Sequence, residues 1–453
     1  MSEKKNNGLF FPSIPKDKDY EDYIASLLAC GGYYLERGIH CWIDTEELLE
    51  LDIVSTKFSY NSADRNLIEI KSGKWGYPEI FKVYGWIKYL EYNKASFIVQ
   101  KDKDKTDLTK EHCKKFFNID LVIDKESEDG SCLDDSDFLS TFNMTPNDCE
   151  YSLLYRIAFG LEAEMFIYLH ERANSFSEAE ENNGYRQVEK YYRRINSLSF
   201  FCSDEITRIQ ELISAFHDNK NLSGRLSELE ATKIFPKEVS RFNDGIFKKL
   251  FYQVEDISPI YVSLYIELLA KLELLKTCVL DYFSPKKDDI FNLLQHDALP
   301  LNVCMTLRNM DNDKYFYLYP YFWQVFIFLF GGFILKPYES EEYELLSQLT
   351  KIPIEEIPKA FAFFDSLFPL KDGKSWFYDK PGTQIRMLQF FPLPLAGTGV
   401  FFRAVNYKNK KGLSEVNYME DLQKQLNDHT VDDMRKWVVL ESKFLERGKR
   451  FKN

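Results

Sequence analysis

Two short runs decide the fold of the N-terminal part of the chain: Glu50-Leu-Asp52-Ile-Val-Ser and Leu67-Ile-Glu69-Ile-Lys71-Ser-Gly73. On a β-strand alternate residues share a face, so Glu69 and Lys71 are expected to point the same way. The midpoint between Asp52 and Glu69 falls at Tyr60–Asn61, within a segment of turn-forming residues. An antiparallel hairpin therefore places Asp52 beside Glu69, so that two carboxylates and a lysine meet at one spot.

Such a cluster suits a divalent metal ion. Two neighbouring carboxylates repel each other unless a cation lies between them. Ligands that are all oxygen favour a hard ion such as Mg²⁺, for which Mn²⁺ is expected to substitute. A bound ion of this kind can polarise a phosphodiester and activate a water molecule. Lys71 beside it could orient that water, assist its deprotonation or stabilise the charge that develops on phosphorus.

The pattern of apolar and turn-forming residues around these runs predicts a compact α/β unit over 19–125, after a polar tail at 1–18. The unit is expected to begin with a helix that Asp19 caps and Gly31-Gly32 ends. Strands at 33–43, 48–56 and 66–71 follow, and Pro78 then opens a second helix that runs to about Tyr92. The remaining elements are a strand at 95–100, a helix at 106–116 and a strand at 119–123.

Asp52, Glu69-x-Lys71 and this order of elements resemble the PD-(D/E)XK nuclease superfamily, over about residues 20–125. The wording of the motifs looks most like the restriction-endonuclease-like branch with Mrr-type domains. The resemblance implies a mixed sheet flanked by helices, with Mg²⁺ bound by Asp52, Glu69 and the main-chain carbonyl of Ile70. It implies that Lys71 is catalytic, and that Glu21 on the first helix is the accessory acid that often supports a second metal.

Two features depart from the pattern of that superfamily. Leu51 stands where its motif has a proline, as in many members. No Gln-x-x-x-Tyr motif follows Lys71, which argues against an exonuclease-like member but leaves the metal site intact.

Residues 126–453 have a different composition and pattern from the predicted α/β unit. Residues 126–150 carry eight acids and no lysine or arginine, which is typical of a solvated linker. Residues 151–453 are expected to be mostly helical, with two helices and a β-hairpin of winged-helix style within 340–404. Helical periodicity is expected over 150–176, 184–199, 203–217, 258–283, 411–427 and 431–448.

One run of 21 residues without charge, Tyr315–Leu335, is long enough to span a bilayer. It could be a transmembrane helix or a helix buried in an aromatic core. Crowded tyrosines, an internal proline and the lack of a second such run favour the buried helix, so no membrane partner is expected.

The net charge and the cysteines indicate which partners and which cell compartment are expected. The formal net charge is −13, which does not exclude a nucleic-acid partner because basic patches can be local. Eight cysteines without a C-x-x-C pair indicate reduced thiols and a cytoplasmic protein. The expected phosphate contacts are Lys74 and Lys82, near the motif, and the helical stripe Arg186, Lys190, Arg193 and Arg194, although a solvated helix face explains the stripe as well.

These observations together predict a Mg²⁺-dependent endonuclease that acts on nucleic acid, with DNA favoured over RNA on the superfamily resemblance. The helical region would select the substrate, form oligomers or bind a partner protein. A role in prokaryotic defence against phage or plasmids is expected by analogy. The alternative is an inactive nuclease fold that serves as a binding module for nucleic acid or protein.

Overall fold

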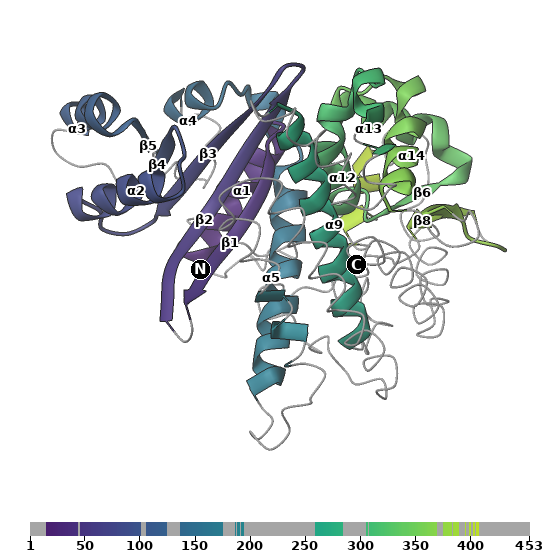
Figure 1. Ribbon diagram of the computed structural model, residues 1–453, viewed down its shortest axis with the longest axis horizontal. Helices are drawn as coiled ribbons and strands as arrows, with labels where there is room; N and C mark the ends of the chain where they lie inside the picture. Colours follow the sequence, from purple (N-terminus) through teal and green to yellow (C-terminus); the bar gives the residue numbers. More distant parts are fainter. Residues whose placement is uncertain are drawn as a thin grey trace, which may run out of the picture. The chain divides into compact units, whose positions relative to one another are not determined.

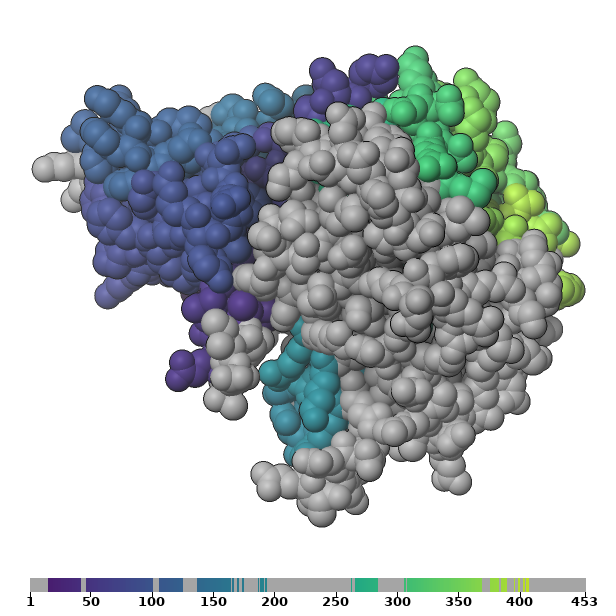
Figure 2. All heavy atoms as spheres, in the orientation of Figure 1, coloured from purple at the N-terminus to yellow at the C-terminus, as the bar shows by residue number. Residues whose placement is uncertain are grey.

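The computed structural model describes most of the N-terminal part of the chain and several segments of the remainder. The described residues are 15–43, 46–100, 106–124, 136–174, 259–283, 308–368, 375–382 and 384–388, with isolated positions in 186–193, 305–306 and 395–406. Grey atoms in Figure 2 mark the others. The chain forms two compact units, Met1–Gly160 and Leu161–Asn453, and each is described by itself.

The N-terminal unit is an α/β domain built on a five-stranded mixed sheet (Figure 1). The strands lie in sequence order, with β1–β2 and β2–β3 antiparallel and β3–β4 and β4–β5 parallel. This is the predicted order of helix, three strands, helix, strand, helix and strand. The elements are α1 (Lys18–Cys30), β1 (Tyr34–Ile43), β2 (Glu46–Ser59), β3 (Ser62–Lys71), α2 (Tyr77–Tyr89), β4 (Ala95–Val99), α3 (Thr106–His112), the π-helix η1 (Cys113–Phe117), β5 (Ile119–Ile123), α4 (Ser136–Thr141) and the 3₁₀ helix η3 (Pro146–Cys149).

The hairpin of β2 and β3 has the register that the sequence predicts. Ser59 pairs with Ser62, and the ladder runs to the pair of Ile53 and Ile68. The next facing positions are therefore Asp52 and Glu69. The two-residue turn is tighter than the nine-residue connection that the sequence predicts, because both strands continue into that polar segment.

The crossover from β3 to β4 follows from glycine and proline placement. Gly76 precedes α2 in an extended conformation, and Pro78 lies in the first turn of that helix, where a missing N–H costs little. The helix buries Ile80, Val83 and Ile87, and it packs against β4, all five residues of which are buried.

Two boundaries of this unit differ from expectation. Helix α1 begins at Lys18, with Asp17 rather than Asp19 at the cap position. Asp17 is held there because its N–H donates to Ser72 Oγ at 3.0 Å, beyond the end of β3. The last residues of the polar tail thus belong to the folded unit.

The second half of the expected acidic linker is also folded. Residues 136–150 contain α4 and η3, and Phe138 and Phe142 are buried. The Tyr33 hydroxyl donates to the Phe142 carbonyl at 2.9 Å, and the two rings meet edge to face. Composition misled here because a few aromatic side chains outweigh several solvated acids in deciding burial.

The C-terminal unit is mostly helical in its described parts. Its elements include the end of α5 (Ser152–Asn174), which crosses the boundary between the units, α9 (Pro259–Phe283), α12 (Tyr319–Phe328), α13 (Glu339–Thr350) and α14 (Ile357–Leu367). Short 3₁₀ turns lie at η5 (Met310–Asn312), η6 (Phe316–Leu318), η7 (Lys336–Tyr338) and η8 (Ile354–Glu356). A three-stranded sheet of order β6-β8-β7 completes it, from β6 (Phe333–Leu335), β7 (Phe377–Asp379) and β8 (Ile385–Leu388).

Several sequence expectations for this unit are met. Helices α5 and α9 match the periodicity at 150–176 and 258–283. Helices α13 and α14 and the antiparallel β7–β8 hairpin supply the two helices and the hairpin expected within 340–404. The expected helices at 203–217, 411–427 and 431–448 lie outside the described residues.

The apolar run Tyr315–Leu335 is mostly buried, as predicted, but it is not a single helix. Helix α12 covers only Tyr319–Phe328, and every residue of it is buried. Gly331 and Gly332 adopt positive φ values of 67° and 76°, which end the helix and turn the chain into β6. None of the described helices is both long and apolar enough to cross a membrane.

Candidate functional site

The carboxylates of Asp52 and Glu69 lie where the β2–β3 ladder ends. Only 7% of Asp52 and 1% of Glu69 is exposed. Asp52 Oδ2 accepts a hydrogen bond of 2.7 Å from the Ile70 N–H, so a side chain takes the place of the next ladder bond. The regular pairing of β2 and β3 therefore stops at this point, beside the two acidic side chains.

The Ile70 carbonyl lies on the same side of β3 as the Ile70 N–H. In a ladder the N–H and C=O of one residue project toward the same neighbouring strand. Because the Ile70 N–H reaches Asp52 on β2, its carbonyl faces that side as well. The following carbonyl, of Lys71, faces the other way and accepts from Gln100 N at 3.0 Å. Asp52, Glu69 and the Ile70 carbonyl, the three oxygen donors that the resemblance implies, thus occupy neighbouring positions on β2 and β3.

Glu69 is the most buried acid of the group. Its Oε1 lies 2.8 Å from Lys71 Nζ and 3.5 Å from Lys82 Nζ. Within the described residues, Glu69 Oε2 has no hydrogen-bond partner. A buried carboxylate oxygen without a partner is costly, and a ligand that supplies positive charge would remove the cost.

The electrostatics of the site favour the binding of a cation. Burial, and then the charges of Glu69 and Glu21, raise the pKa of Asp52 to about 8. Burial opposes the charge on Lys71, but its hydrogen bond to Glu69 and the nearby carboxylates outweigh this and raise its pKa. Lys71 is therefore an ammonium, and the Asp52 carboxyl holds its proton more tightly than an exposed aspartate does.

Glu21 lies on α1, facing the site from a different direction. Burial raises its pKa against the opposing charge of Lys18. Lys18 Nζ lies 2.9 Å from Glu21 Oε2 and 3.1 Å from Glu50 Oε1, so this lysine joins α1 to β2. Lys18 was assigned to the polar tail, although its spacing of three residues from Glu21 is a helical ion-pair signal.

The other sequence candidates separate into two groups. Lys82 belongs to the site, through its contact with Glu69 and its position 4.2 Å from the centre of the Trp86 ring. Lys74 is exposed in the turn that follows β3.

The proposed basic stripe is partly engaged within its own unit. Arg186 Nε donates to the Ala173 carbonyl at 2.8 Å, and Arg193 Nη2 donates to Glu189 at 2.9 Å. Lys190 is exposed, and Arg194 lies outside the described residues. The stripe therefore offers fewer groups to a phosphate than its sequence indicates.

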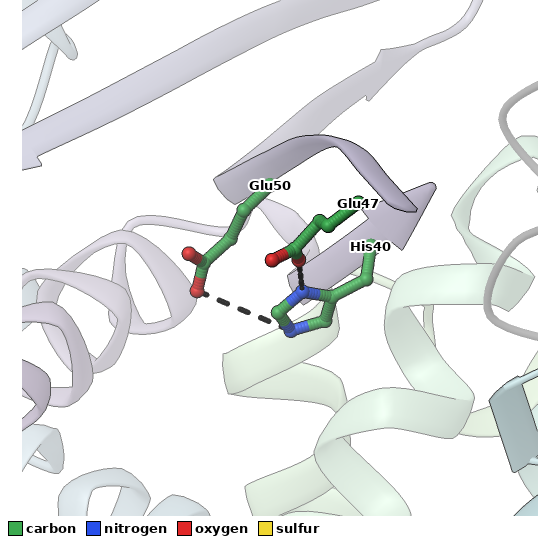
Figure 3. A group of neighbouring side chains, drawn as sticks. All are labelled: His40, Glu47 and Glu50. Carbon is green, nitrogen blue, oxygen red and sulfur yellow. Dashed lines mark hydrogen bonds and ion pairs between the residues drawn. The ribbon is translucent and has the colours of Figure 1, made fainter. Parts of the chain in front are cut away.

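A second polar cluster, which the sequence did not reveal, lies on the β1–β2 hairpin. Across the described part of the chain, His40, Glu47 and Glu50 form the one group of three potential ligands whose atoms lie within 4.8 Å of one another. Glu47 contacts His40 Nδ1, and Glu50 Oε1 lies 4.0 Å from His40 Nε2 (Figure 3). The carboxylates face different nitrogens of one ring, and a single ion uses only one of them, so the group is better described as a half-exposed ion-pair cluster.

Comparisons with known proteins add no relative. No family model matches the chain, and no curated protein or solved structure does so. The functional argument therefore rests on the residues of the site.

Proposed function

We propose that the protein is a Mg²⁺-dependent nuclease with a restriction-endonuclease-like N-terminal domain, and that it hydrolyses phosphodiester bonds of DNA. The observation that carries the proposal is the buried pair of Asp52 and Glu69, one carboxylate with a raised pKa and the other with an oxygen that lacks a partner among the described residues. A divalent cation between them would satisfy both. Asp52, Glu69 and the Ile70 carbonyl would hold it, and the mixed α/β sheet places all three on adjacent strands.

The residues would divide the work as follows. A bound Mg²⁺ would polarise the phosphodiester and lower the pKa of a water molecule. Lys71 carries its proton, so it acts by donating hydrogen bonds to the phosphate or to the water rather than as a base. Binding of metal by Glu69 would release Lys71 toward the substrate. Lys82, anchored on α2, is in reach of the same phosphate.

The C-terminal unit would provide selection of the substrate, oligomerisation or contact with a partner. A nuclease domain joined to a mainly helical unit suits a prokaryotic system that destroys phage or plasmid DNA. This last step rests on analogy with that arrangement.

A second candidate function is favoured by one observation. Glu69 Oε1 already contacts two lysines, which could neutralise the acid permanently. The N-terminal domain would then be an inactive nuclease fold that binds nucleic acid or protein. Binding of a metal ion separates the two candidates, because only the nuclease requires it.

The test uses purified full-length protein with plasmid, linear duplex, single-stranded DNA and RNA, in Mg²⁺, Mn²⁺ or chelator. Asp52→Asn and Glu69→Gln should lose both Mn²⁺ binding, measured by calorimetry, and cleavage. Lys71→Met should keep the metal and lose about 10²–10⁴-fold in rate. Lys94→Met is the matched control, since Lys94 pairs with Asp64 elsewhere in the same unit. Cleavage by Lys71→Met at the wild-type rate, or metal retained by Asp52→Asn, would exclude the proposed site.

A further inference from the structure

Lys18 occupies a central place between two acids of the site region. Its ammonium contacts Glu21 on α1 and Glu50 on β2, at 2.9 and 3.1 Å. Glu50 lies two residues before Asp52 on the same strand, and the charge of Glu21 acts on Asp52. Glu50 has one more basic neighbour, His40, with Nε2 at 4.0 Å.

The charges of this region are nearly matched by lysines. Its four carboxylates belong to Glu21, Glu50, Asp52 and Glu69, and its three ammonium groups to Lys18, Lys71 and Lys82. Three of the four carboxylates have a lysine within ion-pair distance. Asp52 is the exception among the described residues, since the contact that its carboxylate makes is with the Ile70 N–H. Lys18 therefore serves two carboxylates at once, whereas Lys71 and Lys82 both contact Glu69.

The start of α1 is fixed in a way that keeps Lys18 in position. The Asp17 N–H donates to Ser72 Oγ at 3.0 Å, directly after the end of β3. The Pro15 carbonyl accepts from Gln100 Nε2 at 2.9 Å, after the end of β4. The first turn of α1 is thus attached to the strand ends that carry the site, rather than free to fray.

We propose that Lys18 is a built-in cation that replaces a second metal ion, so that the site takes one divalent ion, at Asp52 and Glu69. This inference rests on the proposed function and specifies the metal content of its site. Two carboxylates that face each other need a cation between them, and a tethered ammonium supplies it without dissociating. Glu21 is then a positioning residue that holds Lys18, not a metal ligand.

The contacts of the two acids agree with that assignment, because Lys18 Nζ lies within ion-pair distance of both. An ionised carboxylate pair would attract a divalent ion if Lys18 were absent. Removal of the lysine is therefore expected to create a second metal site rather than merely to weaken the first.

The experiment counts Mn²⁺ ions per chain by calorimetry and by electron paramagnetic resonance, neither of which depends on cleavage. The wild type and Lys94→Met should bind one ion, and Asp52→Asn should bind none. Lys18→Met should bind two, with spin coupling between them, while Lys18→Arg should bind one because it keeps the charge. Adding Glu21→Gln to Lys18→Met should return the count to one.

The outcomes distinguish this inference from the function on which it rests. Two ions in the wild type, or one ion in a folded Lys18→Met, would overturn the role of Lys18 and leave the nuclease proposal standing. If the wild type binds no ion, both fail. Circular dichroism of Lys18→Met establishes that the variant is folded, and the Arg variant gives a charge-conserving comparison in either case.

Discussion

Replacing Asp52 by Asn is expected to change how the stability of the metal-free protein depends on pH. The substitution keeps the shape of the side chain and an oxygen that can accept from the Ile70 N–H, but it removes the titrating group. In the folded chain the pKa of Asp52 is raised from 3.8 to about 8. The unfolded chain releases this proton near pH 4, whereas the folded chain retains it until about pH 8.

The sign and size of the effect follow from proton linkage. Because the folded state binds more protons in this window, the contribution of Asp52 to the free energy of unfolding falls as pH rises from about 4 to about 8. The slope is about 1.4 kcal/mol per pH unit, and the sum over the window is at most about 6 kcal/mol. Below pH 4 both states are protonated, so the carboxyl contributes no pH dependence there.

The measurement is urea denaturation in chelator at pH 5, 6, 7 and 8, for the wild type and Asp52→Asn. The advantage of the Asn variant should grow steadily with pH. Asp64→Asn serves as the control, since Asp64 is exposed and paired with Lys94, and it should show no such trend. Addition of Mn²⁺ at pH 8 should stabilise the wild type but not Asp52→Asn. A difference between the two proteins that stays constant from pH 5 to pH 8 would refute the account of a buried, metal-seeking carboxylate.

Three further predictions concern the metal and the fold. Binding of Mn²⁺ should release about one proton below pH 8, because Asp52 must ionise before it binds the metal. For the same reason the affinity for Mn²⁺ should fall about tenfold for each unit by which the pH decreases. Calorimetry in buffers of different ionisation enthalpy measures both the proton release and the affinity. Arg403→Met should lower the free energy of unfolding, measured in urea, by about 3–5 kcal/mol, since Arg403 and Glu342 form a fully buried ion pair at 2.7 Å. The double variant that also carries Glu342→Leu should recover part of this loss. Equal stability of the single and double variants would contradict the prediction. Gly85→Ala should raise the free energy of unfolding by about 0.5–1 kcal/mol, because the added Cβ would meet open space on α2. Gly399→Ala should lower it, because the added Cβ would collide with the Phe330 carbonyl. Thermal melting measures both variants, and a change of the same sign in the two melting temperatures would contradict the prediction.

The candidate metal site was predictable because it depends on local rules. The alternation of side chains along a strand puts Glu69 and Lys71 on one face, and Lys71 Nζ lies 2.8 Å from Glu69 Oε1. A hairpin register is set by its turn, so the position of Tyr60–Asn61 determined that Asp52 would face Glu69. Both rules act over fewer than about 20 residues, and no distant part of the chain can alter them without breaking the hairpin.

The point at which a helix ends and a strand begins was less predictable from the sequence. The uncharged run Tyr315–Leu335 has an apolar character that fits a helix, a strand or a membrane span equally well. Only the packed unit divides it into α12 and β6, where Arg403 donates to the Phe330 carbonyl at 2.9 Å beyond the helix end. That contact joins residues 73 positions apart, which no local pattern encodes.

By itself, therefore, the sequence determined the α/β order of the N-terminal unit, the hairpin register, and the meeting of Asp52, Glu69 and Lys71. Tertiary structure decided that Lys18 bridges Glu21 and Glu50, that Lys82 reaches Glu69, and that residues 136–150 pack rather than extend. The physical reason is the range of the interactions. The alternation of side chains and the position of a turn depend on adjacent residues. The contact between a helix and the edge of a strand depends on how the buried faces of both elements pack together.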